Sequence, residues 1–154
     1  MREALKSVAS CESFIYSIKD RYPEIATSTL VIVRRGPHRC QLQGKLHFDR
    51  NIVLRVYERV DFVQEKIAYY SYEVYQEASL IYWYDPQPHP TDQTLASTHP
   101  HHKHMHPNIK HHRIPAPELS FDQHKPDEPE PKKINTEKTE QTERAMIGKF
   151  SLAF

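Results

Sequence analysis

Apolar and polar residues alternate along one stretch of the chain, which reads 39-RCQLQGKLHFDRNIVLRVYER-59. Successive side chains of a β-strand point to opposite faces, so this period of two predicts half-buried strands. The polar triplet Asp49-Arg50-Asn51 interrupts the pattern and predicts a hairpin connection. Further strands are expected at 67–75 and 80–84, and the short spacing between them favours an antiparallel meander.

The segment before this meander predicts a helix. Its apolar residues recur at helical spacing, Ser7 is a suitable N-cap, and Pro23 ends the pattern. Residues 29–33 are β-branched and apolar, as in a strand or a buried connector. The expected fold class is therefore α+β: an N-terminal helix packed on a small antiparallel sheet of about four strands, followed by a His-rich segment and a disordered tail.

Composition narrows the class of protein. The 154 residues carry a net charge of +1, which excludes a strongly electrostatic nucleic-acid coat. The longest apolar run, 30–33, is too short to cross a membrane, and the N-terminus lacks the apolar region of a secretory signal. Two cysteines make no disulfide framework, so a cytoplasmic location is expected. We expect one domain over 1–115, including the His-rich segment 86–115, and a polar, disordered tail over 116–154.

Glu58 is a polar residue in phase with the apolar positions of its predicted strand. A buried carboxylate needs partners, or its pKa rises. The simpler interpretation is a strand end at which Glu58 reaches solvent or pairs with an arginine. The functional alternative makes it a general base or an anchor for a histidine.

Tyrosines gather between residues 69 and 84, beside arginines such as Arg55. Ordinary sheet packing accounts for most of them, because tyrosine favours strands. The functional alternative is a surface on which unpaired bases stack while arginines hold phosphates. Under that alternative, Tyr72, Tyr84, Arg55 and His104 are the substrate-binding candidates.

Most of the eleven histidines lie in the segment 86–115, which directly follows Asp85. One interpretation is a solvated loop that binds metal ions adventitiously. A second is a metal site of imidazoles completed by Asp85, although the spacing fits no standard zinc template. We assign no metal ligand and no cofactor at this stage, and leave adventitious or functional zinc open.

The third interpretation is metal-independent acid–base cleavage of RNA, because imidazoles can exchange protons near neutral pH. His101 or His102 would be the base or acid, with His89 as its partner. Asp85 and Glu58 would orient imidazoles, and Lys103 would stabilise the charge on phosphate.

Several short motifs resemble those of the TumE-type toxin family of bacterial toxin–antitoxin systems, over roughly residues 10–115. They are Glu58, Tyr70-Ser71-Tyr72, Tyr84-Asp85, Pro88-His89 and Pro100-His101-His102-Lys103-His104. Three positions depart from the family pattern: Trp83 replaces an arginine, Pro86 an asparagine and Pro90 a histidine.

The resemblance implies a toxin, and a toxin implies a cognate protein antitoxin as partner. The acid–base interpretation of the histidines adds RNA as an expected partner, and no membrane partner is expected. The predicted function is a metal-independent ribonuclease that inhibits translation. The alternatives are a non-enzymatic module that binds a metal or a partner, and an inactive, degenerate family member. A homodimer formed through an exposed edge strand is left open.

Overall fold

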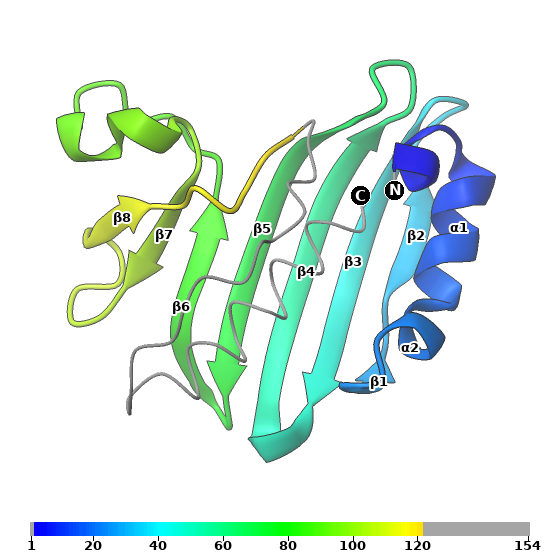
Figure 1. Cartoon of the computed structure of the whole chain (residues 1–154), viewed down its shortest axis with the longest axis horizontal. Coiled ribbons are helices and arrows are strands. Elements are labelled where there is room, and N and C mark those ends of the chain that lie inside the picture. The colour runs from blue at the N-terminus through cyan, green and yellow to red at the C-terminus, as the bar shows by residue number, and fades with distance from the viewer. Residues whose placement is uncertain (1, 122–154) are drawn as a thin grey trace, which may run out of the picture.

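Eight antiparallel strands form one sheet in the computed structural model, which describes residues 2–121 (Figure 1). Their order across the sheet is β1-β3-β4-β5-β6-β7-β8, with β2 also paired to β3. The strand bounds are β1 Ile25–Ser28, β2 Val31–Arg34, β3 Arg39–Phe48, β4 Ile52–Asp61, β5 Lys66–Gln76, β6 Ser79–Asp85, β7 His102–Met105 and β8 Arg113–Pro115. The helices are short: α1 Val8–Tyr16, α2 Ile18–Arg21 and 3-10 turns at Arg2–Leu5, Asp49–Asn51 and Gln93–Thr98.

The predicted fold class, an N-terminal helix packed on a sheet of about four strands, is wrong. The described residues are mostly antiparallel sheet, with twice the expected number of strands and only minor helices. The additional strands come from both ends of the meander. Residues before it form β1 and β2, and the His-rich segment, which was expected to follow the sheet, contributes β7 and β8.

Strands β3 to β6 form the predicted meander, with the hairpin at Asp49–Asn51 joining β3 to β4. Alternation gives this meander two different faces. One, which we call the apolar face, carries buried residues: Cys40, Leu42, Leu46, Leu54, Val56, Tyr72, Val74, Tyr82 and Tyr84. The opposite, polar face carries Gln41, Gln43, Arg55, Tyr57, Arg59, Tyr69, Glu73, Trp83 and Asp85. Each fully buried Leu or Val contributes roughly 1.5–3 kcal/mol to folding.

Helix α1 lies near the β2 end of the sheet, far from β7 and β8 (Figure 1). Its N-terminus is as predicted: Ser7 is the N-cap, and its Oγ accepts a hydrogen bond from the backbone N–H of Ser10 at 3.1 Å. The buried Cys11 contacts Cys40 of the apolar face through a thiol hydrogen bond. Both cysteines are buried free thiols.

Strands β1 and β2 lie end to end along the same edge of β3. The bend between them passes Gly44 so closely that a Cβ there would lie 2.5 Å from the carbonyl oxygen of Thr29. Gly44 also has φ +145°, which side chains rarely adopt. Leu30, in the bend, is buried. A single glycine in β3 therefore lets two short strands cover one long edge.

The described chain continues past the His-rich segment into the expected tail. Ala116 and Leu119 are buried there, so the first residues of the tail belong to the packed core. The remainder of the predicted disordered tail, 122–154, lies outside the described residues, and the division at residue 115 stays a prediction. No helix of the described part is long and apolar enough to cross a membrane.

Candidate active site

The end of β6 and the whole of β7 bring three polar side chains together. In the antiparallel ladder Asp85 pairs with His102, and Trp83 pairs with His104. Paired residues share a sheet face, as do residues two apart on a strand. Asp85, His102 and His104 therefore all point to the polar face. We call these three residues the Asp85 centre.

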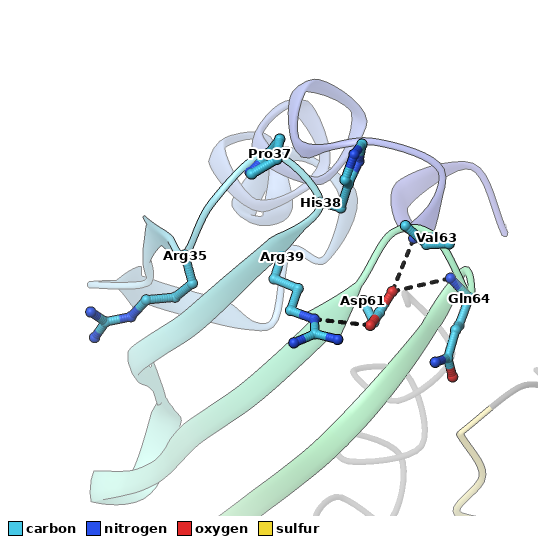
Figure 2. A pocket seen from close by; sticks show the side chains of 7 residues that line it. All are labelled: Arg35, Pro37, His38, Arg39, Asp61, Val63 and Gln64. Atoms are coloured by element: carbon cyan, nitrogen blue, oxygen red, sulfur yellow. Dashed lines mark hydrogen bonds and ion pairs between the residues drawn. The ribbon is translucent and has the colours of Figure 1, made fainter.

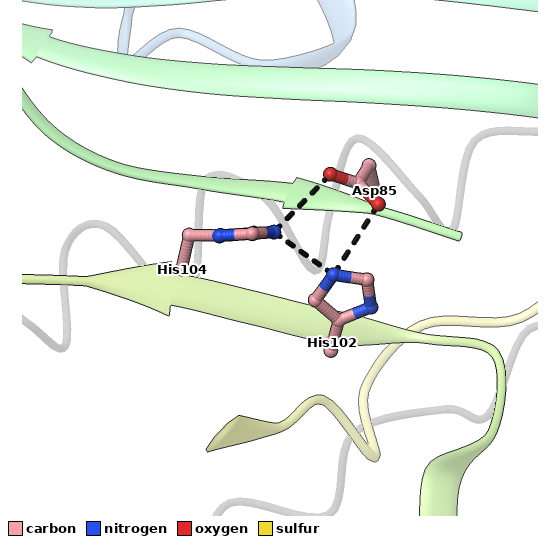
Figure 3. Close-up of side chains that lie close together, drawn as sticks. All are labelled: Asp85, His102 and His104. Carbon is pink, nitrogen blue, oxygen red and sulfur yellow. Dashed lines mark hydrogen bonds and ion pairs between the residues drawn. The ribbon is translucent and has the colours of Figure 1, made fainter. Parts of the chain in front are cut away.

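The side chains of the Asp85 centre converge on one point (Figure 3). The two Nε2 atoms of His102 and His104 are 2.9 Å apart. His102 Nε2 is 3.3 Å from Oδ1 of Asp85, and His104 Nε2 is 3.3 Å from Oδ2. His102 is 1% exposed and His104 is 4% exposed, whereas the Asp85 side chain is 14% exposed. The centre is therefore reached from the Asp85 side.

Surrounding groups hold both imidazoles in place. His102 Nδ1 is 3.0 Å from the carbonyl oxygen of Pro100, and His104 Nδ1 is 3.0 Å from that of Ile109. A carbonyl oxygen only accepts hydrogen bonds, so both Nδ1 atoms are the donors. Trp83 stacks on the His104 ring, with the ring centroids 4.0 Å apart. These contacts fix the orientation of each ring and turn both Nε2 atoms toward Asp85.

Asp85 is held in its ionised form. Burial opposes ionisation, but the contact with His104 and the hydrogen bonds from the Gln87 backbone N–H and the Trp83 indole outweigh it and lower the pKa of Asp85 to about 2. The indole Nε1 donates to Oδ2 at 2.9 Å, and the Gln87 N–H donates to Oδ1 at 2.9 Å. Both carboxylate oxygens are thus positioned by donors before any ligand arrives.

His89 joins the centre from the loop after β6. Its ring packs edge-on against the His102 ring, with the centroids 4.8 Å apart. Burial first, and then the charge of Arg113, lower the pKa of His89 from 6.5, while burial lowers that of His102. The lowered pKa makes His89 a neutral imidazole at neutral pH. Because its side chain is half-exposed, a ligand can reach it.

Four other predicted site residues do not join this centre: the catalytic candidates Lys103, His101 and Glu58 and the substrate-binding candidate Tyr84. Lys103 points to the apolar face, 5% exposed, with its Nζ 3.7 Å from the Tyr82 ring centroid. His101 is bonded through Nδ1 to the Tyr70 hydroxyl at 2.7 Å. Tyr84 is buried on the apolar face, and Glu58 is buried beside Tyr72.

Glu58 is fully buried in the middle of β4, so the expectation that it reaches solvent at a strand end is wrong. Its Oε1 accepts a hydrogen bond from the Tyr72 hydroxyl at 2.6 Å. Its Oε2 has no hydrogen-bond partner in the part of the chain that the structure describes. Burial raises the pKa of Glu58 to about 8, although the Tyr72 bond opposes the shift. The group is therefore a protonated acid at neutral pH.

Two residues near the centre were missed by the sequence interpretation. Trp83 was noted as a departure from the family pattern and was not assigned to the site, yet it both stacks on His104 and donates to Asp85. Its position two residues before Asp85 on a predicted strand was the available signal. Arg113 pairs with His104 across β7 and β8, and its charge acts on His89 and Asp92. No pattern in the sequence indicated β8.

A second concave site lies away from the Asp85 centre, where the β2–β3 and β4–β5 connections meet (Figure 2). It is a pocket of about 370 Å³ whose one carboxylate is Asp61. Asp61 accepts hydrogen bonds from the backbone N–H groups of Val63 and Gln64 and from Arg39 Nε, at 3.0, 3.1 and 3.0 Å. Those bonds, led by the one from Gln64, lower its pKa. Asp61 thus stabilises the β4–β5 turn, and this structural role accounts for the carboxylate in the pocket without a catalytic function.

The family comparison covers both the meander and the Asp85 centre. A family model described as Toxin TumE matches residues 15–142. No curated protein and no solved structure matches the chain. The family match spans most of the sequence and includes every motif on which the resemblance rested. The chain therefore belongs to the TumE toxin family.

Proposed function

We propose that this toxin cleaves RNA and thereby inhibits translation, with the reaction at the Asp85 centre. Membership in a toxin family makes the chain the toxin component of a toxin–antitoxin module, which implies a cognate antitoxin as partner. The observation that carries the proposal is a shared sheet face. The Asp85 centre and a surface of arginines and tyrosines both lie on the polar face.

This surface offers the two contacts that an unpaired RNA strand needs. The guanidinium of Arg59 lies 4.9 Å from the Tyr69 ring centroid, and Tyr57 meets Tyr69 edge to face with centroids 6.1 Å apart. A pocket of about 540 Å³ extends along the same face past Arg55 and Lys45. Tyrosine rings support base stacking, and arginine and lysine hold phosphates. Arg55 thus remains a substrate-binding candidate.

The chemistry follows from His89, Arg113 and the Asp85 centre. Neutral His89 takes the proton of a ribose 2′-hydroxyl, and the 2′-oxygen attacks the adjacent phosphorus. The bond from phosphorus to the 5′-oxygen breaks, that oxygen takes a proton from water, and the proton held on His89 neutralises the hydroxide left behind. Arg113 stabilises the charge that builds on the phosphate oxygens, the role the sequence had given to Lys103. The products carry a 2′,3′-cyclic phosphate and a free 5′-hydroxyl.

The test is induction of the chain in a bacterial host, followed by growth, total RNA integrity and end-group analysis of RNA. We expect growth arrest with fragments that end in a cyclic phosphate. His89→Ala should abolish fragmentation, and His47→Ala, at a half-exposed histidine elsewhere in the sheet, should not.

Arrest with intact RNA would contradict RNA cleavage and leave the toxin acting on another target. Absence of arrest would favour an inactive, degenerate family member. Pairing of two copies through an edge strand stays a prediction, which the mass of the purified protein in solution tests.

A further inference from the structure

Three hydrogen-bond acceptors converge at the Asp85 centre. Because each Nδ1 donates to a carbonyl oxygen, the Nε2 atom of a neutral His102 or His104 presents a lone pair. These lone pairs face each other at 2.9 Å, and a carboxylate that only accepts lies 3.3 Å from each. Acceptors at such distances repel one another unless a proton or a metal ion lies between them. The arrangement is buried, so water screens this repulsion little.

We propose that Asp85, His102 and His104 bind a divalent transition-metal ion, with zinc as the reference ion. Asp85 offers a different oxygen to each imidazole, Oδ1 to His102 Nε2 and Oδ2 to His104 Nε2, so the carboxylate can bind an ion through either oxygen or both. The usual zinc–ligand distance for these nitrogen and oxygen atoms is about 2.05 Å. Donors around such an ion are about 2.9 Å apart at right angles and about 3.3 Å apart at tetrahedral angles. The observed spacings match both values.

The donor types select the class of ion. Imidazole nitrogens suit zinc, copper, nickel and iron, whereas magnesium and calcium prefer oxygen ligands alone. Among the described residues no fourth His, Cys, Asp or Glu atom joins the three. Three protein ligands leave at least one position for water or substrate, as in catalytic zinc sites. That position faces the exposed side of Asp85, where a ligand can enter.

Outer contacts also fit a metal site. Ligating histidines usually donate their second nitrogen to a carbonyl or carboxylate, as His102 and His104 do here. The Trp83 indole holds the Asp85 carboxylate in the same way. Thus both the ligands and the groups that orient them are in place within one pair of strands.

The role of the ion rests on the proposed function, whereas its binding does not. In RNA cleavage a bound ion would polarise the phosphate and stabilise the leaving oxygen. The metal-free reaction expected from the sequence would then be replaced, with His89 still taking the proton of the 2′-hydroxyl. Binding itself follows from the three donors alone and can be measured without RNA.

The experiment is titration of the full chain, stripped with a chelator, with ZnCl₂ by calorimetry and with CoCl₂ by visible absorption. We expect one ion per chain and the cobalt absorption bands of a four- or five-coordinate site with nitrogen and oxygen ligands. Asp85→Asn and His102→Gln should each weaken binding at least ~100-fold, and Trp83→Phe about 10-fold. Circular dichroism of each variant checks that it folds.

A matched control separates this site from adventitious binding by other histidines. His111→Ala with His112→Ala removes two exposed imidazoles of the same segment and leaves the Asp85 centre intact, so binding should be unchanged. Loss of the site in this control, with retention in Asp85→Asn, would overturn the proposal. So would a wild-type chain that shows no saturable binding, whatever the variants do. One bound ion without RNA cleavage would support the site and contradict the proposed function.

Discussion

Replacing Glu58 with glutamine should change how the stability of the protein depends on pH. Glu58 is fully buried, and burial raises its pKa from 4.5 to about 8. An acid with a raised folded-state pKa binds its proton more tightly in the folded chain. Its contribution to stability is therefore fully present below pH 4.5 and is lost as the pH rises toward 8. Glutamine cannot ionise, so Glu58→Gln should remove this loss.

The magnitude follows from the two pKa values. Each pH unit between them costs about 1.4 kcal/mol of folding free energy, so the wild type loses roughly 3 kcal/mol between pH 4.5 and pH 7. This is a large fraction of the total stability of a domain of this size. Relative to wild type, Glu58→Gln should therefore become more stable as the pH rises from 5 to 8. A constant offset is expected from the amide hydrogens that find no partner.

The assay is urea unfolding of both proteins at four pH values between 5 and 8. Both proteins share all other titrating groups, so the contributions of those groups to the pH dependence cancel in the difference between the two unfolding free energies. Glu77→Gln, at an exposed position, is the matched control for the same substitution outside the core. A difference between Glu58→Gln and wild type that stays flat from pH 5 to pH 8 would refute the reasoning, because it would mean that Glu58 is already ionised in the folded chain.

Three further predictions concern the polar face and the framework of the sheet. Tyr69→Ala should weaken binding of a single-stranded RNA oligonucleotide by about 1–3 kcal/mol per stacked base, and Arg59→Ala should lower the salt dependence of binding. Fluorescence anisotropy at several salt concentrations measures both effects. Unchanged affinities in both variants would exclude the polar face as the RNA-binding surface. Gly44→Ala should destabilise the protein by more than ~1 kcal/mol in thermal unfolding, since the added Cβ meets the Thr29 carbonyl; an unchanged melting temperature would show that the bend moves freely. Asp61→Ala should lower the free energy of unfolding by about 1–3 kcal/mol, because two backbone N–H groups lose their acceptor. Arg39→Ala, at a side chain that is 70% exposed, should lower it by at most ~1 kcal/mol. Urea unfolding measures both variants, and equal losses of unfolding free energy would contradict this difference.

The sequence predicted the centre of the fold well. Strands β3 to β6 follow directly from their alternation, because one face of each is buried and the other is not. The hairpin at Asp49–Asn51 and the Ser7 cap are local features, set by residues close in the chain. Such features need no knowledge of tertiary contacts, so single-sequence reasoning finds them.

The ends of the sheet were missed for a different reason. Strand β7 buries His102, Lys103 and His104, residue types that carry no apolar signal. Their burial depends on pairing with β6, and the register of that pairing cannot be deduced from composition. Without the register, Lys103 and His102 look like neighbours at one site, although alternation sends them to opposite faces. The sequence therefore singled out the residues that converge at the Asp85 centre but not their grouping, and their role stays a prediction.

The Asp85 centre is built from the last strands of the described chain, and its His104 is fixed by the carbonyl of Ile109. Ribosomes make proteins from the N-terminus, so β1 to β5 leave the ribosome before the centre can exist. A toxin that cleaves RNA would therefore remain harmless to the ribosome that is translating it until nearly the whole domain has emerged.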